Sequence, residues 1–470
     1  MNQLRSHIYN IVANKFTVSI ENISDDTSPG NLSGWDSVGQ IQLIMRLEKE
    51  FNIQLSLEDA MSMNSVKDII SVIKKYTSKK QSKAPSNIEA IANADAASIL
   101  KLPKVTSWGK GSIHMLSKVD QKNIVVMTGA SGYAAEIKQK IQECLQNKAT
   151  VSFIQKSSGE PKESNIYKVA EILKKESPDL IVAVGGGSCI DTAKLSWVSY
   201  EHPELEFNDI VTPFSLPPLR KKASFIAIPT TFGSGSEVSS AATFSKDGSK
   251  GKTIIISHQL IPDQVILDPN LGKSMPLYTV YVSAFDALTH AIEGYASIVH
   301  NLLVDPYAIY SVKSILSALQ DIQQQGLTDR SLHVLCSCAY YAGIVQNHCS
   351  VGLTHSLAHQ LGGYSISHGL GNALFLTLVM EYNAKGTEKY NQLAKECGFK
   401  SLDKLISVIH GLFKSAYILP NSQVLKKIVD DKVSIIELAM KDITFKTNPI
   451  ALKKDDLESL FDGFRKKFLT

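Results

Sequence analysis

Several features that would assign a chain to a specialised class are scarce in this sequence. Only six of the 470 residues are cysteine, and they are dispersed without the regular spacing of a disulfide framework. A large excess of one sign of charge is lacking too, because 49 lysines and arginines are nearly balanced by 45 aspartates and glutamates. This balance argues against a nucleic-acid partner. No stretch approaches the roughly 20 uninterrupted apolar residues of a membrane-spanning helix, and the polar start lacks the apolar core of a secretion signal. We therefore expect a cytoplasmic protein with reduced cysteines in packing positions and no membrane partner.

The length and composition indicate more than one folded domain. A chain of 470 residues is too long for one ordinary core, and 44% apolar with 20% charged residues is typical of soluble globular proteins. The periodicity of apolar residues divides the chain further. We predict a small helical domain over residues 1–76, a linker over 77–98, an α/β domain over 99–271 and a helical domain over 272–470.

The first segment shows the apolar spacing that is typical of a four-helix bundle. Its second helix is expected to begin at Ser37, directly after a Gly-Trp-Asp sequence, with an apolar stripe that continues to Phe51. Later helix starts at Ser56 and Ser65 have capping-box spacing. The segment 77–98 is poor in large apolar residues, so it cannot build a core and is expected to be a flexible linker.

Beyond residue 99, short apolar runs alternate with helical patterns, which predicts a parallel sheet covered by helices. The runs expected to form buried strands are 123–127, 150–154, 180–184, 224–228 and 265–267. After about residue 272 the strand signal fades, and helical periodicity continues to the C-terminus. The predicted fold class is therefore a helical bundle, then an α/β domain with a parallel sheet, then an all-α domain.

Two loops rich in glycine and hydroxyl groups follow predicted strands. The first contains Gly185, Gly186, Gly187 and Ser188 and leads into a helix with Asp191, and the second contains Thr230, Thr231 and Ser234. Glycines let the backbone approach a pyrophosphate, and free amides at a helix start bind its charge. A glycine triplet alone fits a simple tight turn equally well, but two such loops can converge on one dinucleotide.

A carboxylate and several histidines lie in the helical segment. Asp286 and His290 are four residues apart, which places both on one helix face, and His355, His359 and His368 follow. One carboxylate and three imidazoles suit Fe(II) or Zn(II). A single pair at this spacing more often shares a helix face by chance than binds a metal. Two such pairs and a His-Gly turn in one region favour a metal centre. No glutamate follows His355, so the segment does not have the zinc-protease pattern, in which that glutamate is the general base.

In order and spacing these motifs resemble the iron-containing alcohol dehydrogenases, over about residues 100–470. The resemblance implies that Asp286, His290, His355 and His368 bind Fe(II), with Zn(II) as the alternative. It leaves His359 unligated beside the substrate as a candidate proton relay. It also implies a nicotinamide dinucleotide held along Gly185, Gly186, Gly187, Ser188, Asp191, Thr230, Thr231 and Ser234, with Lys252 as a weaker candidate.

The choice between NADH and NADPH depends on the residue that follows the predicted strand 123–127. The family often has an aspartate there, which binds the adenosine ribose and repels a 2′-phosphate. The matching residue here is Gly129. Loss of the negative charge makes NADPH acceptable, so we expect NAD(P)H with a preference for NADPH.

The region around Ser37 resembles acyl and peptidyl carrier proteins over nearly all of residues 1–76. In that family the matching serine carries 4′-phosphopantetheine, attached by a phosphopantetheinyl transferase, and the resemblance implies the same for Ser37. The positive end of the helix dipole would face the new phosphodiester. The alternative is that Asp36 and Ser37 only cap a helix, since both are good N-cap residues.

Together the two resemblances predict a metal-dependent reductase that converts an aldehyde or ketone to an alcohol. The substrate is expected to be small or bound to the carrier, with an acyl-loading enzyme as a further partner and a homo-oligomer as the assembly. Two alternatives stay open at this point. One is a lyase of the dehydroquinate-synthase type, and the other is a carrier-led scaffold whose dehydrogenase half is inactive.

Overall fold

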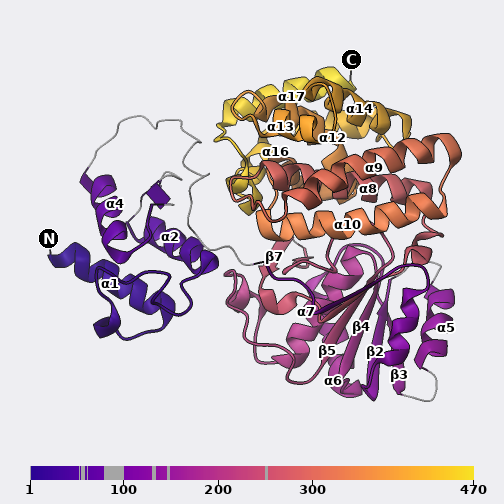
Figure 1. Ribbon diagram of the computed structural model, residues 1–470, viewed down its shortest axis with the longest axis horizontal. Helices are drawn as coiled ribbons and strands as arrows, with labels where there is room; N and C mark the ends of the chain where they lie inside the picture. Colours follow the sequence, from indigo (N-terminus) through magenta and orange to yellow (C-terminus); the bar gives the residue numbers. More distant parts are fainter. Residues whose placement is uncertain are drawn as a thin grey trace. The chain divides into compact units, whose positions relative to one another are not determined.

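The structure, a computed structural model, describes residues 2–51, 53, 55, 59–60, 62–78, 100–129, 134–145, 149–248 and 252–469 (Figure 1). Its contacts divide the chain into two compact units, Met1–Leu100 and Lys101–Thr470. The first unit contains only helices among its described residues, and the second contains a sheet followed by many helices.

The first unit is built on helices α1 (Asn2–Phe16), α2 (Ser37–Phe51) and α4 (Val66–Ser78). Their apolar stripes meet in one core around Trp35, whose ring stacks on that of Phe16 with the ring centroids 5.3 Å apart. The predicted helix start at Ser37 is confirmed, because Ser37 is the first residue of α2. The start at Ser65 is confirmed too, because its hydroxyl bonds both the backbone N–H and the side chain of Asp68. The start predicted at Ser56 and most of the predicted linker lie outside the described residues, and α4 continues to Ser78.

Asp36 caps helix α2. Its Oδ1 atom accepts a hydrogen bond from the Gly39 backbone N–H at 2.8 Å, and the neighbouring Trp35 Nε1 donates to Gln40 at 2.6 Å. Because Asp36 fills the N-cap position, Ser37 is the first residue of the helix rather than its cap. This is the position at which free amides of a helix start are available to an anion.

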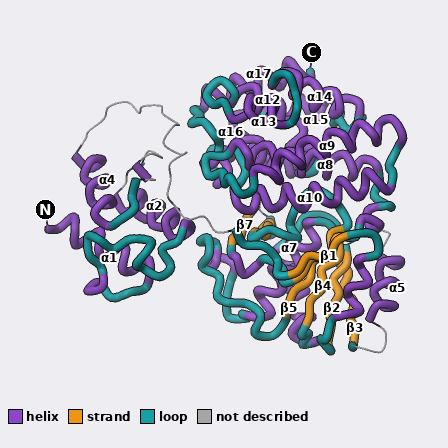
Figure 2. The backbone as a smooth tube through the Cα atoms, viewed as in Figure 1, coloured by secondary structure: helices purple, strands orange, loops and turns teal. Residues whose placement is uncertain are grey.

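The second unit contains a sheet of six strands, each parallel to its neighbours, in the order β1-β8-β5-β4-β2-β3 (Figure 2). The strands are β1 (Val105–Trp108), β2 (Asn123–Thr128), β3 (Thr150–Gln155), β4 (Leu180–Gly185), β5 (Ser224–Pro229) and β8 (Gln264–Leu267). All five predicted strands are confirmed, each one residue longer than expected. Four of the five apolar runs are buried, which explains their clear signal in the sequence. The run 150–154 was expected to be buried too, but β3 lies at the sheet edge and is only partly buried.

Helices cover both faces of the sheet, as the alternation of side chains along β2 shows. Val125 and Met127 join the core beneath α6 (Glu163–Glu176) and α7 (Gly187–Glu201). Ile124 and Val126 point the other way and join the core beneath α5 (Ala134–Leu145). The result is a three-layer α/β arrangement.

The strand order creates a crevice at the carboxyl ends of β2 and β4. From β2 the chain crosses to β3 on one side and then to β4 on the other, so the connections diverge between these two strands. Ligands bind at such a switch point in parallel α/β sheets. In this crevice Gly129 lies next to the turn that begins at Gly185, and the Gly129 N–H donates to the Val184 carbonyl oxygen at 3.1 Å.

Three strands were not predicted. The edge strand β1 is short and mostly exposed, so it lacks a buried apolar run. Strands β6 (Ala241–Ser245) and β7 (Lys252–Ile256) form a separate antiparallel pair. Strand β6 mixes polar and apolar residues, β7 begins with Lys252 and Thr253, and both are only partly buried, which weakens the periodic signal.

The rest of the second unit is helical, drawn in orange to yellow in Figure 1. The helices are α8 (Leu277–Ala296), α9 (Asp305–Gln325), α10 (Asp329–Cys349), α11 (Leu353–Ala358), α12 (His368–Asn383), α13 (Lys389–Glu396), α14 (Leu402–Ser415), α15 (Ser422–Asp430), α16 (Lys432–Ala439) and α17 (Lys454–Phe468). Helix α8 is buried along most of its length and packs against α9, α10 and α12. Within the described ranges, no helix has the length and apolarity needed to cross a bilayer.

The cysteines are packing residues, as predicted. All six are free and buried. Burial raises the pKa of the Cys189 and Cys338 thiols to about 12, so neither forms a thiolate at neutral pH.

Candidate metal centre and dinucleotide site

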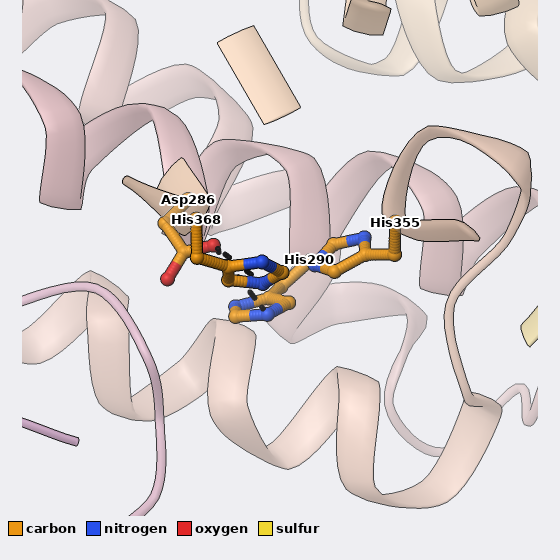
Figure 3. Close-up of side chains that lie close together, drawn as sticks. All are labelled: Asp286, His290, His355 and His368. Carbon is orange, nitrogen blue, oxygen red and sulfur yellow. Dashed lines mark ion pairs between the residues drawn. The ribbon is translucent and has the colours of Figure 1, made fainter. Parts of the chain in front are cut away.

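Four side chains converge in the helical half of the second unit (Figure 3). Asp286 and His290 lie one turn apart on α8, His355 lies on α11, and His368 is the first residue of α12. One donor atom from each side chain lies within 4.8 Å of the corresponding atoms of the other three. Asp286 Oδ1 lies 3.9 Å from His290 Nε2 and 3.5 Å from His368 Nε2. All four residues singled out as metal ligands from the sequence are therefore neighbours in space.

Close backbone packing gives the cluster its shape. A Cβ atom on Gly369 would lie only 2.3 Å from the Val282 carbonyl oxygen, so a side chain there would push α12 away from α8. The glycine after His368 therefore lets the first turn of α12 lie directly against α8, one turn before Asp286. This explains why a His-Gly pair marks the start of this helix.

The donor set fits a divalent metal ion. Burial lowers the pKa of His290 to about 4 and, together with the nearby charge of Lys252, holds the pKa of His368 well below its usual value. Both imidazoles are thus neutral at neutral pH, as ligands must be. Three of the four residues are buried, whereas 28% of the His368 side chain is exposed. One carboxylate and three imidazoles match Fe(II) or Zn(II), and the His368 side of the cluster is the more accessible one.

His359 lies beside this cluster and is oriented by a carboxylate. Its ring stacks on that of His368, with the ring centroids 5.2 Å apart, and its Nδ1 atom lies 2.7 Å from Asp442 Oδ2. Asp442 also accepts hydrogen bonds from the backbone N–H and hydroxyl of Thr444 at 2.9 and 2.8 Å. Burial acts to raise the pKa of Asp442, but the bonds from His359 and Thr444 lower it below the usual value. The carboxylate therefore fixes one edge of the His359 ring.

Asn372, on α12, faces the same central point. Its Nδ2 atom lies 2.8 Å from Asp286 Oδ1, 3.1 Å from His355 Nε2 and 3.4 Å from His368 Nε2. The side chain is fully buried. An amide N–H donated to Asp286 holds that carboxylate in one orientation.

Three of these residues were not predicted from the sequence: Asn372, Asp442 and Glu293, the last of which contacts His355. Helical spacing was a usable signal for Glu293 and Asn372, because they follow His290 by three residues and His368 by four. No local signal existed for Asp442, which lies 83 residues from its partner His359.

The two predicted dinucleotide loops touch each other. The Thr230 N–H donates to the Gly185 carbonyl oxygen at 3.0 Å. A Cβ on Gly186 would lie 2.9 Å from Thr231 Oγ1, and a Cβ on Gly187 would lie 2.7 Å from Ser234 Cβ. Glycine is needed here because the second loop lies directly over the start of α7. The two loops together form a cradle of backbone amides and hydroxyls, which are the groups that bind pyrophosphates at such sites.

Asp191, on α7, supports the second loop through hydrogen bonds. Its carboxylate accepts a hydrogen bond from the Ser236 hydroxyl and two from Thr243, through the backbone N–H and the hydroxyl, both at 3.0 Å. The carboxylate thus anchors the second loop onto α7. Ser188 likewise donates its hydroxyl to the Gly159 carbonyl oxygen at 2.8 Å.

The second loop also packs against the helical half. A Cβ on Gly233 would lie 2.7 Å from the Ser283 carbonyl oxygen on α8, and a Cβ on Gly235 would lie 2.5 Å from the Gly343 Cα on α10. Gln346 on α10 donates to the Ser234 carbonyl oxygen at 2.7 Å. A dinucleotide along these loops would therefore lie next to α8, the helix that carries two of the candidate metal ligands.

Lys252 and Gly129 occupy the margins of this region. Lys252 begins β7, and its Nζ atom lies 2.7 Å from Glu160 Oε1. Gly129 has room for a side chain, because the first atom that a Cβ would meet is the Gly185 Cα at 3.9 Å. A glycine is thus not required by packing at position 129.

Comparison with known proteins gives matches to three family models. Residues 103–269 match the model described as iron-containing alcohol dehydrogenase, and residues 280–464 match the C-terminal model of the Fe-containing alcohol dehydrogenase family. Residues 6–73 match the model of the phosphopantetheine attachment site.

Individual proteins are also similar. An NADPH-dependent butanol dehydrogenase of Clostridium saccharobutylicum is 32% identical over 375 residues, which cover 77% of this chain and 96% of that protein. An aldehyde-alcohol dehydrogenase of Streptococcus pneumoniae is 30% identical over 363 residues, covering 71% of this chain but only 40% of its own length. The solved structure of an iron-containing alcohol dehydrogenase from Thermococcus thioreducens matches with a TM-score of 0.73 at 29% identity, covering 78% of this chain and 100% of the other.

Proposed function

The chain belongs to the iron-containing alcohol dehydrogenase family, and we propose that it interconverts an aldehyde or ketone and the corresponding alcohol, using NAD(P)H and a divalent metal, Fe(II) or Zn(II). The observation that carries this proposal is the convergence of Asp286, His290, His355 and His368 within 4.8 Å. The close packing of the second loop, at Gly233, against Ser283 on α8 supports it further. A cytoplasmic location and a homo-oligomeric state remain predictions.

In the proposed mechanism the metal would be held by Asp286, His290, His355 and His368 and would supply Lewis-acid chemistry toward a carbonyl oxygen. The dinucleotide held by the two loops would supply hydride. The chain positions these groups. The cradle at Gly186 and Gly187 would bind the pyrophosphate through backbone amides, and Thr230, Thr231 and Ser234 would lie along the dinucleotide. The carboxylate of Asp191 would keep the second loop closed over it.

His359 is proposed as the residue that moves a proton. Its Nδ1 atom is held by Asp442, so its Nε2 atom is the one left to exchange a proton with the product oxygen. Stacking on His368 keeps the imidazole at the edge of the cluster rather than among its donor atoms.

We propose NADPH as the preferred dinucleotide and expect Gly129→Asp to reverse the preference. A carboxylate at the crevice between β2 and β4 would repel a 2′-phosphate, which lowers NADPH affinity by about 10-fold to 100-fold. NADH affinity should stay within a few fold. Titrations of both dinucleotides would measure this, with Gly129→Ala as the matched control that adds a Cβ but no charge. Equal loss for both dinucleotides in Gly129→Asp would contradict the assignment.

The carrier unit restricts the source of the substrate. An acyl group on a phosphopantetheine arm at Ser37 is a thioester, at the oxidation level of an acid, and one hydride transfer does not convert it to an alcohol. Either the arm presents a ketone or aldehyde elsewhere on the acyl chain, or a partner enzyme with its own hydride donor reduces the thioester and releases an aldehyde and the free thiol beside this one. The partners would be a phosphopantetheinyl transferase and an acyl-loading enzyme. The Streptococcus pneumoniae relative is named for both aldehyde and alcohol dehydrogenase activity, which supports a pairing of these reactions.

Nicotinamide oxidation in the presence of candidate substrates tests the reaction class. The metal-loaded protein would be incubated with NADPH and, separately, with free aldehydes, ketones and acyl thioesters. The proposal expects consumption of NADPH with a carbonyl compound and none with a simple acyl thioester. Consumption with the thioester alone would assign a different reaction to the site.

A further inference from the structure

Glu293 is a buried carboxylate behind the candidate metal ligands. It lies on α8, one turn after His290, and only 3% of its surface is exposed. Oε1 accepts the Thr354 N–H at 2.6 Å, and Oε2 accepts the Gly352 N–H at 2.9 Å. Oε2 also lies 2.6 Å from Nδ1 of His355. One side chain thus holds both the loop that leads into α11 and the imidazole on that helix.

The contacts determine which imidazole nitrogen carries the proton. Backbone N–H groups can only donate, so both oxygens of Glu293 act as acceptors toward the loop. A carboxylate that accepts on both oxygens requires a proton on Nδ1 of His355, which donates it to Oε2. The Nε2 atom then keeps its lone pair, and Nε2 is the atom that faces Asn372 and the cluster.

We propose that Glu293 is a positioning residue for the metal centre, which fixes the tautomer and orientation of His355 and anchors the turn before α11. The inference rests on the proposed function, because it assumes that His355 is a metal ligand. Ligating histidines commonly donate their second ring N–H to a carboxylate, which fixes the ring and strengthens the ligand. Here the same carboxylate also binds two backbone amides, so the ligand and its supporting loop move together.

A glutamine cannot replace this glutamate. It has the same shape, but one oxygen becomes an NH₂ group that only donates. If that group faces Thr354, two N–H donors oppose each other. If it faces His355, the imidazole must move its proton to Nε2, where the proton blocks metal binding. Either orientation leaves a buried donor without an acceptor.

Metal affinity of Glu293→Gln, measured by competition with a chelator, tests the proposal without relying on turnover. The expected result is about 10-fold to 100-fold weaker binding of Zn(II) or Co(II) than in the wild type, with an altered Co(II) absorption spectrum. Glu201→Gln is a matched control. Glu201 is also buried and binds backbone N–H groups of residues 220–223, but it lies on α7 in the α/β half. That control should keep wild-type metal affinity.

The outcomes separate this inference from the proposed function. If the wild-type chain binds no divalent metal, the proposed function fails. If the wild type binds metal and Glu293→Gln binds it equally well, the role of Glu293 is wrong. Should the variant fail to fold, the imidazole tautomer can be read by nitrogen NMR in the zinc-loaded wild type, with His355→Asn to assign the signal. A proton on Nδ1 supports the proposal, and a proton on Nε2 overturns it.

Discussion

Replacing His290 with alanine is expected to abolish tight metal binding and to lower kcat/KM for carbonyl reduction by at least about 1000-fold. The side chain is 3% exposed and lies within 4.8 Å of the other three donors, so no solvent-exposed group can take its place. The variant keeps only Asp286, His355 and His368 as donors, which are too few to hold the ion tightly. Metal content of the purified variant and its rate of NADPH oxidation would measure both effects.

A second histidine provides the control for this variant. His333 lies on α10, where its ring packs against Trp108, outside the cluster. His333→Ala should keep wild-type metal content and activity. The account would be contradicted if His290→Ala kept stoichiometric metal and wild-type turnover while remaining folded.

Replacing Ser37 with alanine is expected to remove phosphopantetheinylation completely. The residue is the first of α2, after the cap at Asp36, and the match to the phosphopantetheine attachment model spans residues 6–73. Intact-protein mass spectrometry after coexpression with a phosphopantetheinyl transferase should show the mass of one arm on the wild type and none on the variant. Ser33→Ala, in the exposed loop before the helix, is the matched control and should be modified normally.

The same variant separates the two halves of the chain. Ser37→Ala should reduce a free aldehyde at the wild-type rate, because the candidate metal and dinucleotide residues all belong to the second unit. Reduction of a ketone or aldehyde presented on the carrier arm should stop. A modified Ser37→Ala chain would show that another residue carries the arm.

The sequence predicted those parts of the structure that depend on local pattern. Buried strands such as 180–184 are continuous apolar runs, and Asp286 and His290 share a helix face through their spacing alone. The contact between the two loops was anticipated because both follow strands of one parallel sheet. The exposed strand β1 escaped notice because its burial is set by the sheet edge rather than by its own residues.

The supporting groups of the site were harder to predict because they depend on tertiary contacts. A glutamate such as Glu293 is one of 45 acidic residues, and only the return of the chain at Gly352 makes it a buried acceptor. Asp191 was expected to belong to the dinucleotide site, but its contacts with Ser236 and Thr243 could not be inferred from spacing. Such pairings become visible only after the chain has folded.

The central claim is that Asp286, His290, His355 and His368 hold a metal on which carbonyl reduction depends. It is tested most directly by measuring NADPH oxidation with an aldehyde before chelation, after complete removal of metal, and after return of Fe(II) or Zn(II). The account predicts that activity falls to background when the metal is removed and returns with one equivalent of metal per chain. Full activity in verifiably metal-free protein would contradict it.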